Sequence, residues 1–354
     1  MPKFLFFSNF AILGHSGPNL ELLYLFSSVL QNKEGLILMK IKPILKGFST
    51  FIPGVQKILP EKGTGGTKSA LYCYEVWLKH LILLYENGLH KIPNTMAEIG
   101  PGDSLGIGLA ALLSGVNNYY ALDVVKYSDV TTNLRIFDEL VLLFKTRAGR
   151  PTKGWPDYDK YLPDDLFPNH ILSDEMLDAS LSDERIMRIR NAITNPNSQN
   201  EGIIIKYLVP WFEHSIIEHE TVDVIVSHAV MEHVSDLNNT YNSLYLWLKP
   251  NGLMSHQIDL TCHGLSKQWN GYRKYSELLW KIIVGKRPFL INRQPCSVHA
   301  DLLGKYGFKI VCYLKRHRND GIHKSQLSPY WRTISDDDLT CSGIFIQAQK
   351  RLKK

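Results

Sequence analysis

Three glycines within seven residues, Gly100, Gly102 and Gly106, stand in the stretch MAEIGPGDSLGIGLAALLSG at residues 96–115. An apolar run precedes them and an apolar pattern with helical spacing follows, which is typical of a strand, a tight turn and a helix. Such a turn brings the backbone close to a nucleotide-like ligand. Taken alone the pattern is weak evidence, because glycine pairs with this spacing also arise by chance.

Two acidic residues narrow the choice of ligand. Glu98 lies two residues before Gly100, where its carboxylate would repel a pyrophosphate and attract an α-ammonium group. Asp123 ends the next apolar stretch, NNYYALDVV, where a carboxylate accepts hydrogen bonds from both ribose hydroxyls. Asp123 suits NAD and S-adenosylmethionine equally, whereas Glu98 favours S-adenosylmethionine. The residues we expect to bind that cofactor are Glu98, Gly100, Pro101, Gly102, Ser104, Asp123 and His228.

Histidines and carboxylates gather in two later segments, SHAVMEHV at 227–234 and SHQIDLTCH at 255–263. If the methyl acceptor is a hydroxyl, a base with a pKa near neutrality helps, which points first to histidine. We predict that His233 or His263 is this base and that Asp259 orients it. For each of them, a purely structural role is the alternative.

The spacing in the second segment separates two of its side chains. His256 and Asp259 are three residues apart in a strand-like run, so they point to opposite faces and only one can face a substrate. Asp259 is nearer the end of the run and is the better candidate. In the first segment, His228 could only shape the cofactor pocket, and Glu232 with His233 could only pack and cap a helix.

The order of these blocks resembles that of class I S-adenosylmethionine-dependent methyltransferases. Those enzymes share E/D-x-G-x-G-x-S/T-x-G after the first strand, an acid after the second, D-x-I in the fourth, then EHV and an LKPNG-like turn. Here the corresponding blocks read AEIGPGDSLG, YYALD, VDVIVSHAV, EHV and LKPNG. The resemblance implies a methyltransferase that uses S-adenosylmethionine.

Two further segments resemble methyltransferases of bacterial surface-polysaccharide and lipopolysaccharide clusters. They are GTGGTKSALYCYEVWLKHL, before the glycine loop, and SHQIDLTCH. This resemblance implies O-methylation of a small-molecule or sugar- or glycan-related acceptor. Two alternatives stay open: a methyltransferase fold that binds or scaffolds without catalysis, and an NAD-binding oxidoreductase.

The EHV block is also similar to ubiquinone-pathway O-methyltransferases, where an E-x-x-E-H cluster can hold a divalent cation. In this chain Ala229 takes the place of the first glutamate. We therefore expect no metal at this position.

The elements that must position these residues form an α/β pattern. We expect a Rossmann-like seven-stranded methyltransferase sheet, mostly parallel with the last strand antiparallel, flanked by helices. Asp103 or Ser104 is the expected N-cap of the helix after the glycine loop, and SDEMLDASLSDERIMRIRNAI is expected to form one helix. The expected units are an N-terminal extension (1–62, with 1–38 loosely attached), a first half with the cofactor loop (63–149), a helical and irregular insert acting as a substrate lid (150–202), and a second half (203–354).

Composition limits the partners of the 354-residue chain. Its 44% hydrophobic residues can form a full core, and its net charge of +6 falls short of the basic stripe of a dedicated nucleic-acid binder. Its five cysteines include no C-x-x-C pair, which favours free thiols in a reducing compartment. No apolar run approaches the roughly 18 residues of a membrane span. We expect a cytoplasmic location, with peripheral contact at the inner membrane surface as an option.

Overall fold

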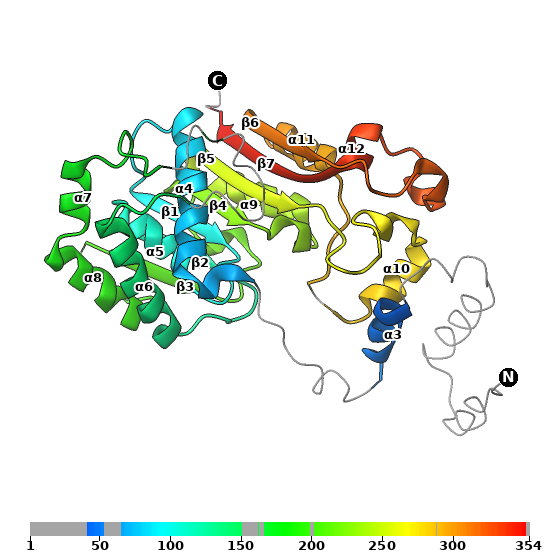
Figure 1. Ribbon diagram of the computed structural model, residues 1–354, viewed down its shortest axis with the longest axis horizontal. Helices are drawn as coiled ribbons and strands as arrows, with labels where there is room; N and C mark the ends of the chain where they lie inside the picture. Colours follow the sequence, from blue (N-terminus) through cyan, green and yellow to red (C-terminus); the bar gives the residue numbers. More distant parts are fainter. Residues whose placement is uncertain are drawn as a thin grey trace.

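A seven-stranded sheet forms the centre of the computed structural model, which describes residues 41–52, 65–150, 162, 166–198, 202–287 and 289–351. The strand order is β3-β2-β1-β4-β5-β7-β6 (Figure 1). Strands β1 to β5 pair in parallel, and β7 is antiparallel to both β5 and β6. This confirms the predicted Rossmann-like methyltransferase sheet. The strands are β1 (Thr95–Ile99), β2 (Asn118–Leu122), β3 (Ile204–Leu208), β4 (Val222–His228), β5 (Leu248–Asp259), β6 (Phe308–His317) and β7 (Cys341–Lys350).

Helices cover both faces of the sheet, because alternate strand residues feed two separate apolar clusters. Met96 and Val226 belong to the cluster under α4, α5, α6, α7 and α8. Ala97 and Ile225 belong to the cluster under α9 and α11. No described helix is long and apolar enough to cross a membrane. The helices are α3 (Ile41–Ser49), α4 (Ala70–Glu86), α5 (Gly106–Leu113), α6 (Val130–Lys145), α7 (Asp174–Ser180), α8 (Asp183–Thr194), α9 (Leu237–Trp247), α10 (Glu277–Val284), α11 (Cys296–Lys305) and α12 (Asp336–Thr340), with short 3-10 turns at η2 (Gly66–Lys68) and η5 (Met231–His233).

The N-cap predicted for α5 is wrong. The helix begins at Gly106, and its cap residue is Leu105. The Leu105 side chain makes no capping hydrogen bond. Instead, the Leu105 amide donates to Oδ1 of Asn133 on α6 at 2.9 Å, and the Gly106 amide donates to Oγ of Ser104 at 3.1 Å. Asn133 of the neighbouring helix and Ser104 therefore share the first free amides, whereas Leu105 occupies the cap position itself.

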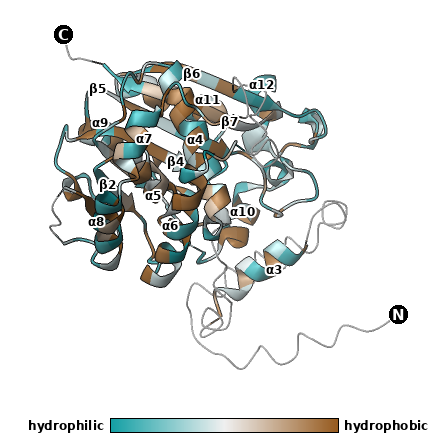
Figure 2. Ribbon diagram, turned by 60° about the vertical axis from the view of Figure 1, so that its left-hand side comes forward, coloured by the Kyte–Doolittle hydropathy of each residue, from teal (hydrophilic) through white to brown (hydrophobic). Residues whose placement is uncertain are grey.

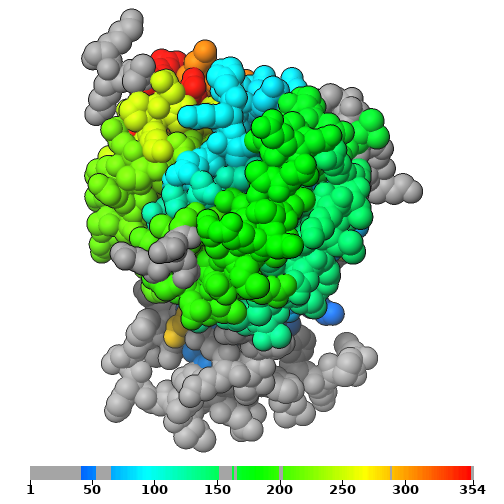
Figure 3. Space-filling view, turned by 90° about the vertical axis from the view of Figure 1, so that its left-hand side faces the viewer, coloured from blue at the N-terminus to red at the C-terminus, as the bar shows by residue number. Residues whose placement is uncertain are grey.

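The insert contains two helices where one was predicted. α7 ends at Ser180, and Ser182 starts α8 by accepting a hydrogen bond from the Arg185 amide. The Arg185 guanidinium donates to the carbonyls of Leu112 and Val116, where α5 ends and β2 is about to begin. This is the amino-terminal edge of the sheet, so α7 and α8 are not a lid over the opposite edge. Figure 3 shows this segment, in green, against the teal atoms of the preceding helices. Residues 151–161, 163–165 and 199–201 lie outside the described part.

A smaller lobe is built from α3 and α10. Figures 1 and 2 show α3 beside α10, away from the helices that cover the sheet. A third apolar cluster, including Ile44, Tyr275 and Ile283, fills this lobe. Gly47 allows α3 to lie close to the backbone of α10, because a Cβ at this position would lie 2.1 Å from the carbonyl oxygen of Ile282. Of the predicted 1–62 extension, residues 1–40 and 53–62 lie outside the described residues.

Candidate active site

The glycine loop leaves β1 at the carboxyl edge of the sheet and enters α5. Gly100 and Gly102 have φ angles of 68° and 75°, in the left-handed region that favours glycine. A Cβ on Gly100 would also lie 2.6 Å from Cγ2 of Val230, in the segment after β4. The loop therefore needs glycine at both positions for its backbone conformation, and at Gly100 also for its close packing on Val230.

The segment before α4 holds this loop in place. Ser104, a predicted cofactor residue, donates its hydroxyl to the carbonyl of Thr67, and its amide lies 3.3 Å from Oγ1 of Thr67. The Cys73 thiol lies 3.4 Å from the same carbonyl. The described end of the GTGGT motif, from Gly65 onward, therefore packs directly on the cofactor loop.

Glu98 lies beneath the loop. Its buried carboxylate accepts a hydrogen bond from the Tyr119 hydroxyl at 2.5 Å and also interacts with the backbone amide of Gly108. Burial raises the pKa of Glu98 to about 8, against an ordinary value of 4.5. The carboxylate thus joins β1, β2 and α5. Sequence reasoning missed Tyr119 as its partner.

Asp123 follows β2 and lies beside the glycine loop. Its Oδ1 accepts from the Val124 amide at 2.7 Å, and the Gly102 amide also interacts with this carboxylate. Burial raises the pKa of the carboxyl group. The structure therefore brings together Asp123 and Gly102, two residues predicted to share one ligand.

His228 ends β4 with a buried ring nitrogen that lacks a partner. Among the described residues, its Nε2 has no hydrogen bond, whereas its Nδ1 lies 3.3 Å from Nε2 of His80 on α4. His80 Nδ1 in turn meets the Ser255 hydroxyl at 2.7 Å. Burial lowers the pKa of His228 to about 3, with Lys79 contributing, so the ring is neutral. No sequence pattern pointed to His80, because it lies on a helix that precedes the glycine loop.

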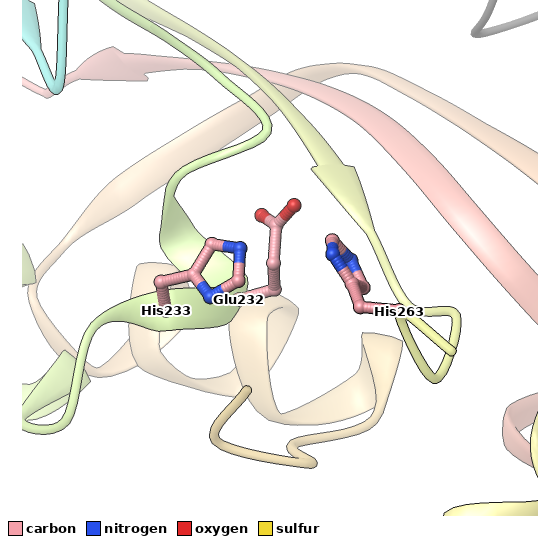
Figure 4. A group of neighbouring side chains, drawn as sticks. All are labelled: Glu232, His233 and His263. Carbon is pink, nitrogen blue, oxygen red and sulfur yellow. The ribbon is translucent and has the colours of Figure 1, made fainter. Parts of the chain in front are cut away.

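A second group of polar side chains lies where β4 and β5 end (Figure 4). Nε2 of His263 lies 3.3 Å from Oδ2 of Asp259, and the Asp259 Oδ1 accepts from the Thr261 amide at 2.9 Å. The His233 and His263 rings meet edge to face with centroids 5.0 Å apart. The structure therefore brings the three predicted catalytic residues together.

Burial controls the charge of this group. It lowers the pKa of His233 to about 4, with His263 contributing, so the imidazole is neutral at physiological pH. Burial also raises the pKa of Glu232 well above its usual value, with Asp259 contributing. Nδ1 of His233 lies 3.1 Å from the Phe289 carbonyl, which fixes the proton on that nitrogen and leaves Nε2 with a lone pair.

His256 points away from this group, as the strand spacing predicts. It is fully buried and meets the Ser227 hydroxyl at 2.8 Å, on the face of the sheet that packs against α9. Its role in the described structure is packing.

Comparison with known families gives one match. The sequence profile described as "Methyltransferase domain" matches residues 173–255, which run from α7 into β5 and include the EHV block. No curated protein matches the chain. This segment is therefore similar to a methyltransferase domain, in agreement with the sequence prediction.

Several solved structures are similar to this chain. The phosphoethanolamine N-methyltransferase 2 of Haemonchus contortus, solved with S-adenosylmethionine, is 14% identical with a TM-score of 0.39, over 80% of this chain and 57% of that one. A Mesorhizobium loti S-adenosylmethionine-dependent methyltransferase is 11% identical with a TM-score of 0.39, over 79% of this chain and 100% of that one. The chain thus spans little more than half the length of the nematode protein.

Proposed function

We propose that this protein transfers the methyl group of S-adenosylmethionine to a hydroxyl oxygen of a small-molecule or sugar-related acceptor. The observation that carries the proposal is the arrangement at one sheet edge. A glycine loop and an adjacent acid lie at the ends of β1 and β2, and a histidine–carboxylate group lies at the ends of β4 and β5. Parallel sheets of this kind bind ligands at their carboxyl edge.

The residues around the glycine loop fit the cofactor. The backbone from Gly100 through Pro101 to Gly102 offers a surface without side chains at its two ends, and Asp123 is placed to accept hydrogen bonds from ribose hydroxyls. His228 offers an unpartnered buried nitrogen nearby. When bound, S-adenosylmethionine would supply an activated methyl group.

The acceptor hydroxyl would meet the imidazoles of His233 and His263. Asp259 orients His263 through Nε2, which leaves Nδ1 of His263 available to accept the acceptor's proton. The sugar-related class of the acceptor, and a cytoplasmic site of action near the inner membrane surface, are supported by the resemblance to polysaccharide-cluster enzymes.

Binding experiments test the cofactor. Calorimetry should show that the protein binds S-adenosylmethionine and not NAD. Gly100→Ala should weaken this binding at least tenfold, because the new Cβ is strained by the backbone and contacts Val230. Gly304→Ala, on α11 with no atom within 4 Å of the added Cβ, is the matched control. Binding of NAD without S-adenosylmethionine would refute the proposal.

Transfer from radiolabelled S-adenosylmethionine to a panel of hydroxylated sugars and phenols tests the reaction. Replacing His233, Asp259 and His263 separately by alanine should lower turnover, since a general base typically contributes about 100-fold or more. If all three variants kept wild-type turnover, the assigned roles would be wrong. Cofactor binding with no transfer to any acceptor would instead indicate a binding or scaffold protein.

A further inference from the structure

We infer that Glu232, His233 and His263 form a binding site for a divalent transition-metal ion. Each of the three offers one ligand atom, and these atoms lie within 4.8 Å of one another. Figure 4 shows the three side chains converging from η5 and from the loop after β5. The first two residues are adjacent in the sequence, and the third is contributed by a different strand end.

The Glu232 carboxylate is the clearest sign of a missing partner. It is 2% exposed, and although the backbone amides of Glu232 and Asp259 interact with it, neither of its oxygens makes a hydrogen bond of ordinary geometry with a described residue. Burial disfavours the ionised form of this carboxyl group, and a bound cation would stabilise that form by compensating its charge. Two imidazole rings beside it supply the remaining ligands.

Both histidines are already oriented as metal ligands are. His233 directs Nδ1 to the Phe289 carbonyl, and His263 directs Nε2 to the Asp259 carboxylate. Metal-binding histidines commonly donate one ring N–H to a carbonyl or carboxylate, which fixes the lone pair of the other nitrogen on the metal. Each ring here makes one such contact, so each leaves one nitrogen for an ion.

The ligand types select the class of ion. Two imidazoles with one carboxylate suit Zn²⁺, Co²⁺ or Mn²⁺ better than Mg²⁺ or Ca²⁺, which prefer oxygen ligands alone. Ligand atoms around zinc are about 3.4 Å apart, so these side chains would have to close by about 1 Å on binding. The His263 side chain is 32% exposed and has room to move. Three protein ligands leave a position open for an oxygen of the acceptor.

The sequence predicts no metal at the EHV block because one ligand is missing there, whereas the structure brings in another ligand from a different segment. Ala229 takes the place of a possible glutamate ligand, and its φ angle of 56° belongs to the turn after β4. His263 supplies the third ligand from the loop after β5, at a distance in sequence that no motif spacing reveals. The catalytic meaning of the site rests on the proposed function, because an ion bound to these nitrogens would hold the acceptor oxygen in place of a free base.

Cobalt titration tests the inference without any measurement of activity. The full-length protein should bind one equivalent of Co²⁺ with visible absorption bands, and Zn²⁺ should displace it. Glu232→Gln and His263→Ala should each weaken Co²⁺ binding at least 100-fold. Asp259→Asn should weaken it about 10- to 100-fold, because this side chain orients His263. His90→Ala, an exposed histidine outside the site, is the matched control and should bind like the wild type.

The outcomes separate this inference from the proposed function. Absence of saturable one-equivalent binding, or wild-type affinity in both Glu232→Gln and His263→Ala, would overturn the metal site. Circular dichroism checks that the variants fold, and His263→Ala changes a partly exposed side chain, which guards against a folding defect. Calorimetry with S-adenosylmethionine on the same samples tests the cofactor separately, so either proposal can fail while the other stands.

Discussion

Glu98 is a structural carboxyl group as much as a candidate ligand group. Its hydrogen bond from Tyr119 and its contact with the Gly108 amide join the first two strands to the helix that begins at the glycine loop. Burial outweighs these two hydrogen bonds, so the folded protein favours the protonated form of Glu98 over a range of pH in which a glutamate in the unfolded chain is ionised.

This difference predicts a pH-dependent stability. The pKa of Glu98 is about 8 in the folded protein and near 4.5 in the unfolded chain, so its contribution is complete below 4.5 and is lost as the pH rises toward 8. Glu98→Gln stays neutral throughout. Its free energy of unfolding should therefore fall less steeply than that of the wild type between pH 5 and pH 8, by up to about 1.4 kcal/mol per pH unit.

Urea unfolding at several pH values measures this effect. Glu139→Gln, which changes an exposed carboxyl group on α6, should keep the wild-type pH dependence. Identical pH profiles for the wild type and Glu98→Gln would show that Glu98 is ionised in the folded protein at all of these pH values.

Sequence reasoning located the ionisable groups of the site but not all of their partners. Glu98, Asp123, Asp259 and His263 follow or end apolar runs, and the ends of parallel strands meet at one edge. The contact between His80 and His228 joins α4 to β4, residues far apart in the sequence. No local pattern encodes that pairing.

At the scale of elements, α5 lies against β2 with almost no space between them. A Cβ on Gly108 would lie 2.0 Å from Cζ of Tyr119, so the ring packs directly on the helix backbone. The hydroxyl of the same tyrosine donates a hydrogen bond to Glu98. The position of the Tyr119 ring therefore depends on the absence of a side chain at Gly108.

Gly108→Ala should therefore destabilise the protein by about 1–3 kcal/mol, because a well-packed core cannot accept the extra methyl group without moving the ring. Gly304→Ala, in α11 with open space around the new Cβ, should be neutral or stabilising by up to about 1 kcal/mol. Thermal or urea unfolding gives both values. Equal stabilities for the two variants would contradict the tight packing.

Most elements follow the apolar periodicity of the sequence, whereas their ends depend on neighbours. The predicted strands and the long helices α4 and α6 are present. The start of α5 is set by Asn133 from α6, and the break between α7 and α8 occurs because Ser182 caps a new helix. Phe167, in the insert, packs edge to face on Phe144 of α6, a contact between residues that no local pattern pairs.

At the scale of the whole molecule, α3 is attached to α10 through close backbone contacts. Gly47 faces the carbonyl oxygens of Ile282 and Ile283, and the Thr50 hydroxyl accepts from the Lys286 amide at 2.9 Å. Among the described helices and strands, α3 packs mainly against α10, so its position depends on this contact.

Gly47→Ala should release α3 from α10 without affecting the sheet. Hydrogen exchange should become at least tenfold faster in residues 41–49 and 277–284, since the methyl group would overlap backbone oxygens. Exchange in β1 and β4 should be unchanged. Leu45→Ala, on the exposed side of α3, is the control. Unchanged exchange in α3 of Gly47→Ala would show that other contacts hold the helix.

The sheet topology was predictable because strand and helix patterns alternate, but the place of the insert was not. Its charged amphipathic pattern indicates a surface helix without saying which edge of the sheet it covers. Arg185 decides this through carbonyls at the end of α5, a contact that only the folded chain reveals.

The position of β7 has a consequence for how the protein is made. β6 joins the sheet only through β7, which is synthesised after it. While the ribosome is still adding Cys341–Lys350, β6 has no strand to pair with. By that time β1 to β5 can already assemble. We therefore expect the final third of the chain to fold late in translation or after it, a period in which the unpaired β6 is open to chaperones or to wrong partners.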